Sequence, residues 1–262
     1  MRDTAPAVTM LTFGPMIDSE TARRLLRLYQ VPFVEERHLF GWASVLSLVR
    51  AGTVRIPVVI GPGRPLSGSR AVADHFEPAA PRDRKLLPDD PDLRSQVEAD
   101  WAAFNGQLAG PVAVVAYYHL LPQTQPMIAA FSEGVAPGEA ARTAQWYGLL
   151  RWLFTVLLQL NPAHAAQALA RVRQAVDAVE RRLADGRSFL VGGQLSLSDV
   201  SFACALAPLA LPAAYSAPVP RFDQMPPGLQ TIVAEMRRRP VFGYIDRIYA
   251  LMDARSPPAA GP

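Results

Sequence analysis

The sequence predicts a small α/β domain followed by a larger all-helical domain. Strand-like and helical segments alternate over residues 1–78, and a stretch rich in proline and charge follows over 79–92. Over 93–262, apolar residues recur at helical spacing. A chain of 262 residues is long enough to bury two cores. We therefore expect two domains joined by a linker.

The first domain begins with a strand, a helix and a second strand. Residues 7–13 are rich in β-forming residues and stop at Gly14-Pro15. Residues 19–30 carry apolar side chains at spacings of three and four, which is typical of a helix. Residues 31–38 suggest a strand that starts near Pro32. Because proline cannot donate to a sheet, this strand suits an edge position.

The rest of the first domain completes a four-stranded plan. A partly helical stretch at 41–52 is followed by a strand at 54–60, a turn at 61–65 and a helix at 66–76. The order is βαβα and then ββα. This order is the thioredoxin-like plan, a small sheet with helices on both faces.

The second domain is predicted to be a helical bundle. Apolar residues recur every three or four positions over 97–115, where Pro111 predicts a kink, and over 169–183, where Gly186 marks the stop. Further helices are expected at 142–160, 198–210, 226–238 and 240–253. The apolar run at 146–160 is too short to span a bilayer, so it predicts a buried helix.

Composition excludes several classes of protein. The single cysteine, Cys204, rules out an internal disulfide and Cys/His metal clusters, and we expect it to be an inert buried thiol. The four histidines lack ligand spacing, so no metal is predicted. The net charge of +3 is spread along the chain, which does not indicate a nucleic-acid-binding face. The N-terminus lacks the apolar stretch of a signal peptide, which favours a cytoplasmic protein with no membrane partner.

Ser196 and Asp199 stand three residues apart at the start of an apolar helix. This spacing is that of a capping box, in which each side chain satisfies a backbone N–H of the other's turn. We therefore expect a structural role for this pair.

Three motifs in the predicted order resemble those of the cytosolic glutathione S-transferases. Ile56-Pro57-Val58 is similar to the family's Val-Pro-Val strand, whose proline is cis. "LSGSRAVADHF" (66–76) resembles the helix motif that follows that strand in the family, and "FLVGGQLSLSDVSFACAL" (189–206) resembles the signature before its buried central helix. The resemblance covers nearly the whole chain and is to a bacterial-type member with a divergent active site. It implies glutathione as co-substrate, a hydrophobic small molecule as second partner, a homodimer and a detoxification role.

Ile56 and Pro57 are candidate glutathione-binding residues. A cis bend at Pro57 would expose the N–H and C=O of Ile56, with which a short peptide such as glutathione can pair as an added strand. The alternative is that Pro57 only starts an edge strand.

Ser69 lies in the first turn of the helix predicted at 66–76, where its hydroxyl and the free N–H groups form a site for a carboxylate. In the family this serine holds the γ-glutamyl carboxylate, and a plain N-cap is the alternative. The family has Glu or Gln before the serine, whereas this chain has Gly68. The resemblance adds three further candidate contacts: Arg55, for which simple solvation is the alternative, and His38 and Trp42, which border the same cleft by analogy.

The turn before the first helix is where the family places the residue that stabilises the glutathione thiolate. The family uses a Tyr near the end of the first strand, or a Ser or Cys in the turn. Here Met16 falls at the Ser/Cys position, and a thioether cannot donate a hydrogen bond. Ser19 is the best remaining donor, with Thr12 weaker, although Ser19 and Asp18 can equally be helix caps. Backbone amides of residues 16–19 and the helix dipole are a further source of stabilisation.

The resemblance places the electrophile against the first long helix of the second domain. Candidate lining residues of this hydrophobic site are Met16, Phe104, Gln107, Val114 and Tyr118. The proline-rich stretch 211–227 would cap the cleft or meet a partner subunit. The leading function is conjugation or transformation of a hydrophobic electrophile with glutathione. The alternatives are a non-catalytic binding or scaffold protein of the same fold, or a specialised lyase or isomerase.

Overall fold

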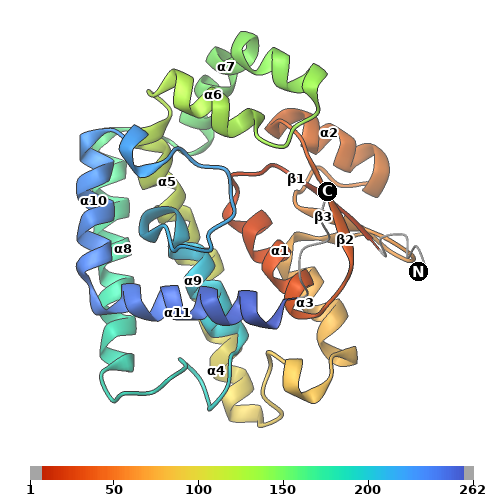
Figure 1. Cartoon of the computed structure of the whole chain (residues 1–262), viewed down its shortest axis with the longest axis vertical. Helices are drawn as coiled ribbons and strands as arrows, with labels where there is room; N and C mark the ends of the chain where they lie inside the picture. Colours follow the sequence, from red (N-terminus) through yellow and green to blue (C-terminus); the bar gives the residue numbers. More distant parts are fainter. Residues whose placement is uncertain (1–7, 257–262) are drawn as a thin grey trace.

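The computed structural model describes residues 8–256, and its helical part surrounds one side of a small sheet (Figure 1). The first part of the chain follows the predicted order of strands and helices. Its elements are β1 (Val8–Thr12), α1 (Ile17–Leu28), β2 (Phe33–Arg37), α2 (Phe40–Ala51), β3 (Val58–Ile60), β4 (Leu66–Ser67) and α3 (Gly68–Phe76).

The four strands form one sheet in the order β2-β1-β3-β4. β1 pairs with β2 in parallel, and the two other pairings are antiparallel. β2 lies at the edge, which confirms the position expected for a strand that starts after Pro32. The strand predicted at 54–60 is shorter than expected, because the Ile56–Pro57 bond is cis and regular pairing begins only at Val58.

Helices cover both faces of this sheet, as the thioredoxin-like plan requires. α1 and α3 contact each other, whereas α2 contacts β1 and β3. α1 also contacts α9 and α11 of the helical domain, so it lies between the sheet and the helical bundle (Figure 1). The N-terminus of α1 is thereby held at the junction of the two domains.

The predicted linker is irregular but anchored. It contains two short 3₁₀ turns, Glu77–Ala79 and Arg82–Arg84. The Glu77 carboxylate accepts hydrogen bonds from the backbone N–H groups of Leu86 and Leu87 and from the Tyr29 hydroxyl. This carboxylate thus ties the linker to α1.

The second domain is helical throughout its described length. Its elements are α4 (Pro91–Trp101), a π-helical segment (Ala102–Leu108), α5 (Ala109–Leu120), α6 (Thr124–Ser132), α7 (Pro137–Leu157), α8 (Pro162–Leu183), α9 (Leu197–Ala210), a 3₁₀ turn (Phe222–Gln224), α10 (Pro227–Arg238) and α11 (Pro240–Arg255). α9 is entirely buried and contacts α1, α4, α5, α10 and α11. It forms the centre of the bundle.

Asp199 holds the start of α9. Its carboxylate accepts hydrogen bonds from the backbone N–H and the hydroxyl of Ser196, both at 2.7 Å, and from the backbone N–H of Leu190 at 2.8 Å. The Tyr244 hydroxyl also donates to it. These bonds confirm the structural role expected for the Ser196–Asp199 pair.

The helix predicted at 97–115 is interrupted rather than simply kinked at Pro111. The π-helical segment Ala102–Leu108 separates α4 from α5. Because Pro111 has no N–H, the carbonyl one turn before it loses its usual α-helical donor. The π-helical turns, which are wider than α-helical ones, lie immediately before Pro111 in the chain.

The prediction of a buried helix at 146–160 was wrong. α7 buries only one face, formed by Thr143, Tyr147, Leu150 and Phe154. Trp146 is 50% exposed and Trp152 is 61% exposed. α7 packs mainly on α6, so its apolar run is covered on one side. Within residues 8–256, none of the helices combines the length and the apolar character that crossing a membrane needs.

Candidate functional site

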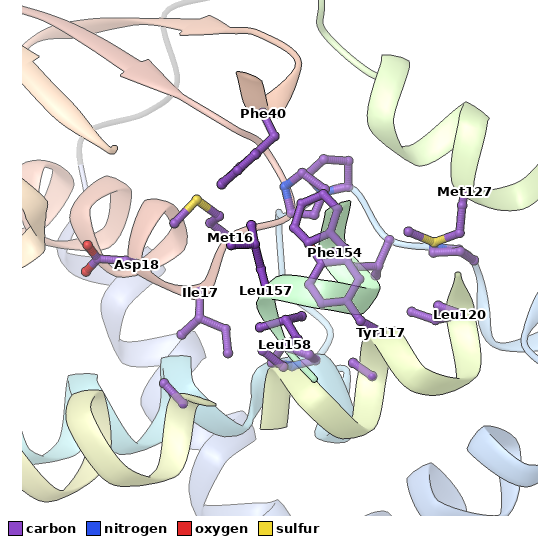
Figure 2. Close-up of a pocket in the computed structure, with 18 of the residues that line it drawn as sticks. Met16, Ile17, Asp18, Phe40, Tyr117, Leu120, Met127, Phe154, Leu157 and Leu158 are labelled. Atoms are coloured by element: carbon purple, nitrogen blue, oxygen red, sulfur yellow. The ribbon is translucent and has the colours of Figure 1, made fainter. Parts of the chain in front are cut away.

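An apolar cavity of about 250 Å³ lies between the sheet domain and the helical bundle (Figure 2). The first domain contributes the turn before α1, the start of α1 and the first residue of α2. The bundle contributes one face of α5, the end of α7 and the segment after α9. The lining residues are Pro15, Met16, Ile17, Asp18, Phe40, Ala109, Ala113, Ala116, Tyr117, Leu120, Met127, Phe154, Leu157, Leu158, Pro208, Pro218, Val219, Pro220 and Met225.

Aromatic rings form one wall of this cavity. Tyr117 stacks on Phe154 with ring centroids 5.0 Å apart and an interplanar angle of 17°. Phe40 packs against the same Phe154 ring at 5.0 Å. Phe13 lies behind them, at 5.7 Å from Phe40 and 5.8 Å from Phe154. Such mutually packed rings lose little freedom when a ligand binds, so the wall is preformed.

The Tyr117 hydroxyl is a polar group in this apolar wall. It is buried and has no hydrogen-bond partner among the residues that the structure describes. Burial raises the pKa of Tyr117, so the hydroxyl stays neutral. A buried donor without a partner is costly, and a ligand atom that accepts a hydrogen bond would remove that cost.

A second, polar pocket of about 450 Å³ adjoins the apolar cavity. The two share Ile17, Asp18 and Ala109. The other lining residues of the polar pocket are Arg55, Ser67, Gly68, Ser69, Arg70, Trp101, Ala102, Asn105 and Gly106. The start of α1 therefore separates a pocket suited to a polar ligand from a cavity suited to an apolar one.

Asp18 is bound to Ser69 at this boundary. The Ser69 hydroxyl and the Ser69 backbone N–H, 3.3 Å away, both donate to Asp18 Oδ1. Burial raises the pKa of the Asp18 carboxyl, while the hydrogen bonds from Ser69 and the charge of Arg55 act in the opposite direction. The N-terminus of α3 thus already holds a carboxylate, which belongs to the chain itself.

Gly68 is hydrogen-bonded to the backbone at Pro57. The Gly68 N–H donates to the carbonyl of Pro57 at 2.8 Å, and Gly68 has a φ of +83°. A Cβ added at Gly68 would lie 3.3 Å from Asp18 Oδ2 and 3.8 Å from Arg55 Nε. A side chain at this position would therefore be strained and would press on Asp18.

The first turn of α1 has no side-chain cap. Met16 is the N-cap residue, and no side chain accepts a hydrogen bond from the turn. The first N–H groups of an α-helix have no partner within the helix. The positive end of the α1 dipole and these amides consequently lie beside the boundary between the two pockets.

Part of the helical domain resembles a known family. Residues 162–247 match the family model described as "Glutathione S-transferase, C-terminal domain". This span runs from the start of α8 into α11 and includes the buried α9. Over these residues the chain is similar to the C-terminal domain of the glutathione S-transferases.

Several solved structures share the fold over nearly the whole chain. FzlA from C. crescentus has 19% sequence identity and a TM-score of 0.54, covering 97% of this chain and 95% of its own. The beta-etherase LigF from Sphingobium sp. strain SYK-6 has 16% identity and a TM-score of 0.59, covering 94% and 99%. A glutathione S-transferase from Methylobacterium radiotolerans in complex with glutathione sulfonate has 16% identity and a TM-score of 0.53, covering 90% and 92%. None of the curated proteins compared with the sequence matches it.

In this glutathione S-transferase fold, neither predicted hydroxyl donor reaches the pockets. Thr12 ends β1, is fully buried and donates to Glu35 Oε1 at 2.8 Å. Ser19 is the third residue of α1 and is also fully buried, with no partner for its hydroxyl among the described residues. The prediction that Ser19 or Asp18 caps α1 was wrong, because Asp18 bonds Ser69 and the cap position belongs to Met16.

Of the residues predicted to bind glutathione, Arg55, Gly68 and Ser69 line the polar pocket. His38 and Trp42 line neither this pocket nor the apolar cavity. His38 Nδ1 lies 2.9 Å from Glu139 Oε2, which ties it to α7. Trp42 is 53% exposed on the outer side of α2.

Of the residues predicted to line the hydrophobic site, only Met16 does so. Phe104 is buried against Phe202, and Gln107 lies on the side of the bundle that faces α8. Val114 is buried and does not line the cavity. Tyr118 does not line it either, but the preceding residue, Tyr117, does. The face of α5 that lines the cavity is Ala109, Ala113, Ala116, Tyr117 and Leu120.

The sequence carried weak signals for the residues that were missed. The residues of α5 that line the cavity follow helical spacing, but three of the five are alanines. Alanine is small and common in helices, so its positions do not mark a ligand-binding face. Pro218, Val219, Pro220 and Met225 belong to the proline-rich stretch 211–227, one of whose two predicted roles was to cap the cleft. These four residues line the cavity within this chain.

Proposed function

We propose that this chain binds glutathione in the polar pocket and transforms an apolar electrophile held in the adjoining cavity. The observation that supports this proposal is the adjacency of the two pockets, which share Ile17 and Asp18 at the start of α1. A thiol placed at this boundary would face an apolar ligand directly. The reaction would then need positioning and a lowered thiol pKa, with no covalent bond to the protein.

The groups that would stabilise the thiolate are backbone amides of the first turn of α1. Met16 contributes an apolar side chain to the cavity and leaves the turn without a side-chain cap. The N–H groups of residues 17–19 and the helix dipole then favour an anion at this end. The contribution expected from one such helix terminus is about 0.3–1 kcal/mol at an exposed site, which predicts a modest effect on the thiol pKa.

Arg55 is the cation best placed for the glutathione peptide. It lines the polar pocket, and its guanidinium forms no ion pair with any residue in the described part of the chain. Arg70, in contrast, is already paired with Glu98 and Asp74. We therefore assign a glutathione carboxylate to Arg55.

The apolar ligand should carry one hydrogen-bond acceptor for Tyr117. The remaining lining is aliphatic, aromatic, methionine or proline, apart from Asp18 at the edge (Figure 2). Aryl compounds with a carbonyl, nitro or ether oxygen meet both requirements. Because one structural neighbour is a beta-etherase, ethers belong in the set of compounds to be tested.

Kinetics with glutathione and 1-chloro-2,4-dinitrobenzene, followed by the same assay with an aryl ether, test this function. We expect turnover that saturates in both substrates. A titration of the far-ultraviolet absorbance of bound glutathione should show its thiol pKa below that of free glutathione. Binding of neither substrate by calorimetry would refute the proposal.

A second candidate is a ligand-binding protein that keeps the fold without the chemistry. Met16 at the position of the usual donor and the Asp18–Ser69 pair favour it. This candidate predicts that an apolar ligand binds in the cavity with or without glutathione and remains unchanged. Recovery of the intact ligand after prolonged incubation with protein and glutathione would support it.

The remaining expectations from the family enter as parts of this proposal. We propose a homodimer in the cytoplasm, with a role in detoxification. Sedimentation at several protein concentrations measures the first of these directly. Among residues 8–256, no group of three or more His, Cys, Asp or Glu side chains is arranged to hold a metal ion.

A further inference from the structure

The N-terminus of α3 binds a carboxylate in this structure, and that carboxylate comes from Asp18. Ser69 supplies two donors to Asp18 Oδ1, its hydroxyl and its backbone N–H. Ser69 is only 2% exposed, whereas Asp18 is partly exposed and lines both pockets. Charge-assisted hydrogen bonds of this kind are about twice as strong as neutral ones.

Asp18 reaches Ser69 because residue 68 has no side chain. A Cβ at that position would lie 3.3 Å from Asp18 Oδ2, closer than most such contacts. Gly68 also has a φ of +83°, which glycine tolerates best. Asp18 and Gly68 therefore form one arrangement: the glycine leaves the space and the carboxylate fills it.

The rest of the polar pocket offers donors that are still unused. The Ser67 hydroxyl and the Asn105 side-chain N–H₂ are buried and have no hydrogen-bond partner in the described residues. Arg55 adds a positive charge beside them. The pocket thus suits a polar, anionic ligand, but its most enclosed carboxylate anchor is occupied.

A ligand carboxylate at Ser69 would have to displace Asp18. Two carboxylates cannot both stay ionised within a few ångströms of one another without a large cost. The charged groups that face Asp18 from the neighbouring elements are Arg55, before β3, and Arg70, on α3, and the charge of Arg70 is already balanced by Glu98 and Asp74. A second anion at this point is therefore poorly compensated.

We propose that Asp18 is an internal competitor for the carboxylate anchor at Ser69, and that it weakens the binding of glutathione and similar carboxylate-bearing peptides. The inference rests on the proposed function, since glutathione is taken as the ligand of the polar pocket. Asp18 is then a specificity-determining residue. It selects for ligands that engage Arg55, Ser67 and Asn105 and place no carboxylate at Ser69.

Calorimetry with glutathione on the full chain tests the inference. Asp18→Ala should lower the Kd for glutathione by about tenfold or more, because the charged hydrogen-bond partner of Ser69 becomes a ligand group. The gain should disappear in Asp18→Ala/Ser69→Ala, which removes the hydroxyl anchor. Asp223→Ala, which removes an exposed carboxylate outside both pockets, should bind as the native chain does.

A matched pair of probes isolates the carboxylate. 4-Aminobutyryl-cysteinylglycine equals glutathione without the α-carboxylate of its glutamyl residue. Asp18→Ala should bind this analogue no tighter than the native chain does. An equal gain for both peptides would overturn the inference, because it would show that Asp18 obstructs the pocket by size alone.

Thermal unfolding of each variant checks that the fold is kept. Should Asp18→Ala fail to fold, Asp18→Asn provides the test, because a neutral amide of similar shape competes less well with a ligand carboxylate. A Kd equal to that of the native chain in a folded Asp18 variant would overturn the inference. This failure can be distinguished from failure of the proposed function, in which neither the native chain nor any folded Asp18 variant binds glutathione.

Discussion

Helix α1 carries two polar regions one turn apart that are built in opposite ways. In the first, the side chains of Glu20, Arg23 and Arg24 are almost completely buried, and every charge has partners. In the second, the N-terminal turn, the Ser19 hydroxyl has no partner in the described chain and Asp18 is held by a single residue, Ser69. The buried charges that join the two domains are therefore fully paired, whereas polar groups with few or no hydrogen-bond partners lie where the two pockets meet.

The paired region connects three parts of the fold. Arg23 donates from Nε to Glu35 of β2 at 2.8 Å, and Arg24 bonds Asp253 of α11 and the carbonyl of Ala214 in the proline-rich stretch. Glu20 lies between the two arginines and accepts a further bond from Ser216 at 3.0 Å. We call Glu20, Arg23, Arg24, Glu35, Ser216 and Asp253 the Glu20 network. It fixes α1 between the sheet and the bundle.

Breaking the Glu20 network should have the largest effect on stability. Glu20→Ala leaves Arg23 and Arg24 buried without their shared carboxylate, so the free energy of unfolding should fall by about 3 kcal/mol or more. Urea denaturation measures this change. Asp18→Ala, on the same helix two residues earlier, is the matched control and should stay within about 1 kcal/mol of the native chain. Equal losses in both variants would erase the contrast between the two regions.

The second-largest effect expected is a loss of stability in acid, through protonation of Glu35 in the Glu20 network. Burial alone would raise the pKa of Glu35, but the hydrogen bond and charge of Arg23, with smaller effects of Arg37 and Thr12, lower it from 4.5 to about 2. Since the folded-state pKa lies below the unfolded one, this stabilisation is present above pH 4.5 and is lost as the pH falls towards about 2. The loss should be about 3 kcal/mol.

Urea denaturation at a series of acid pH values measures this loss. Glu35→Gln is the control variant: it should be less stable near neutral pH, and its stability should depend less on pH over this range. A native-chain stability that does not change over the same range would contradict the assignment.

Tyr117 and Tyr147 compare an unused hydroxyl with a used one. Tyr147 donates to the carbonyl of Leu121 at 2.6 Å, whereas Tyr117 has no partner in the described residues. Tyr147→Phe should cost about 1 kcal/mol of stability and leave ligand binding unchanged. Tyr117→Phe should cost no stability and should weaken binding of an acceptor-bearing ligand about tenfold.

Calorimetry with an aryl ketone and with the hydrocarbon of the same shape measures the Tyr117 effect. The hydrocarbon should bind equally well to the native chain and to Tyr117→Phe. Weaker binding of both ligands would show that the substitution altered the shape of the cavity rather than a hydrogen bond.

The fold was predictable from the sequence because its signals are local or repeated. Alternating strands and helices, the proline at the cis bend and the Ser196–Asp199 pair each act within a few residues of the chain. The burial of α7 was not predictable in this way. Its apolar run gives the same signal whether neighbouring helices cover all of it or, as here, one face.

The site was less predictable because its residues meet across long stretches of sequence. Gly68 and Ser69 follow from one local motif and Arg55 from its place before another, and all three line the polar pocket. The partner of Ser69 is Asp18, 51 residues away, and no pattern in the sequence pairs them. The resemblance of the turn before α1 to that of the family suggested Ser19 as the hydrogen-bond donor to the thiolate. In the helix, however, the Ser19 side chain points into the core.

The smallest expected effect is that of Ser19→Ala. The hydroxyl of Ser19 is fully buried, has no partner in the described chain and lines neither pocket, so it can neither touch a bound thiol nor stabilise the fold. Turnover with glutathione should stay the same, and the free energy of unfolding should change by less than about 0.5 kcal/mol. Because an unpaired buried hydroxyl is unfavourable, any change in stability should be a gain. A large loss of turnover with unchanged unfolding would instead mean that Ser19 reaches the thiol, and the N-terminal turn of α1 would then hold a side-chain donor after all.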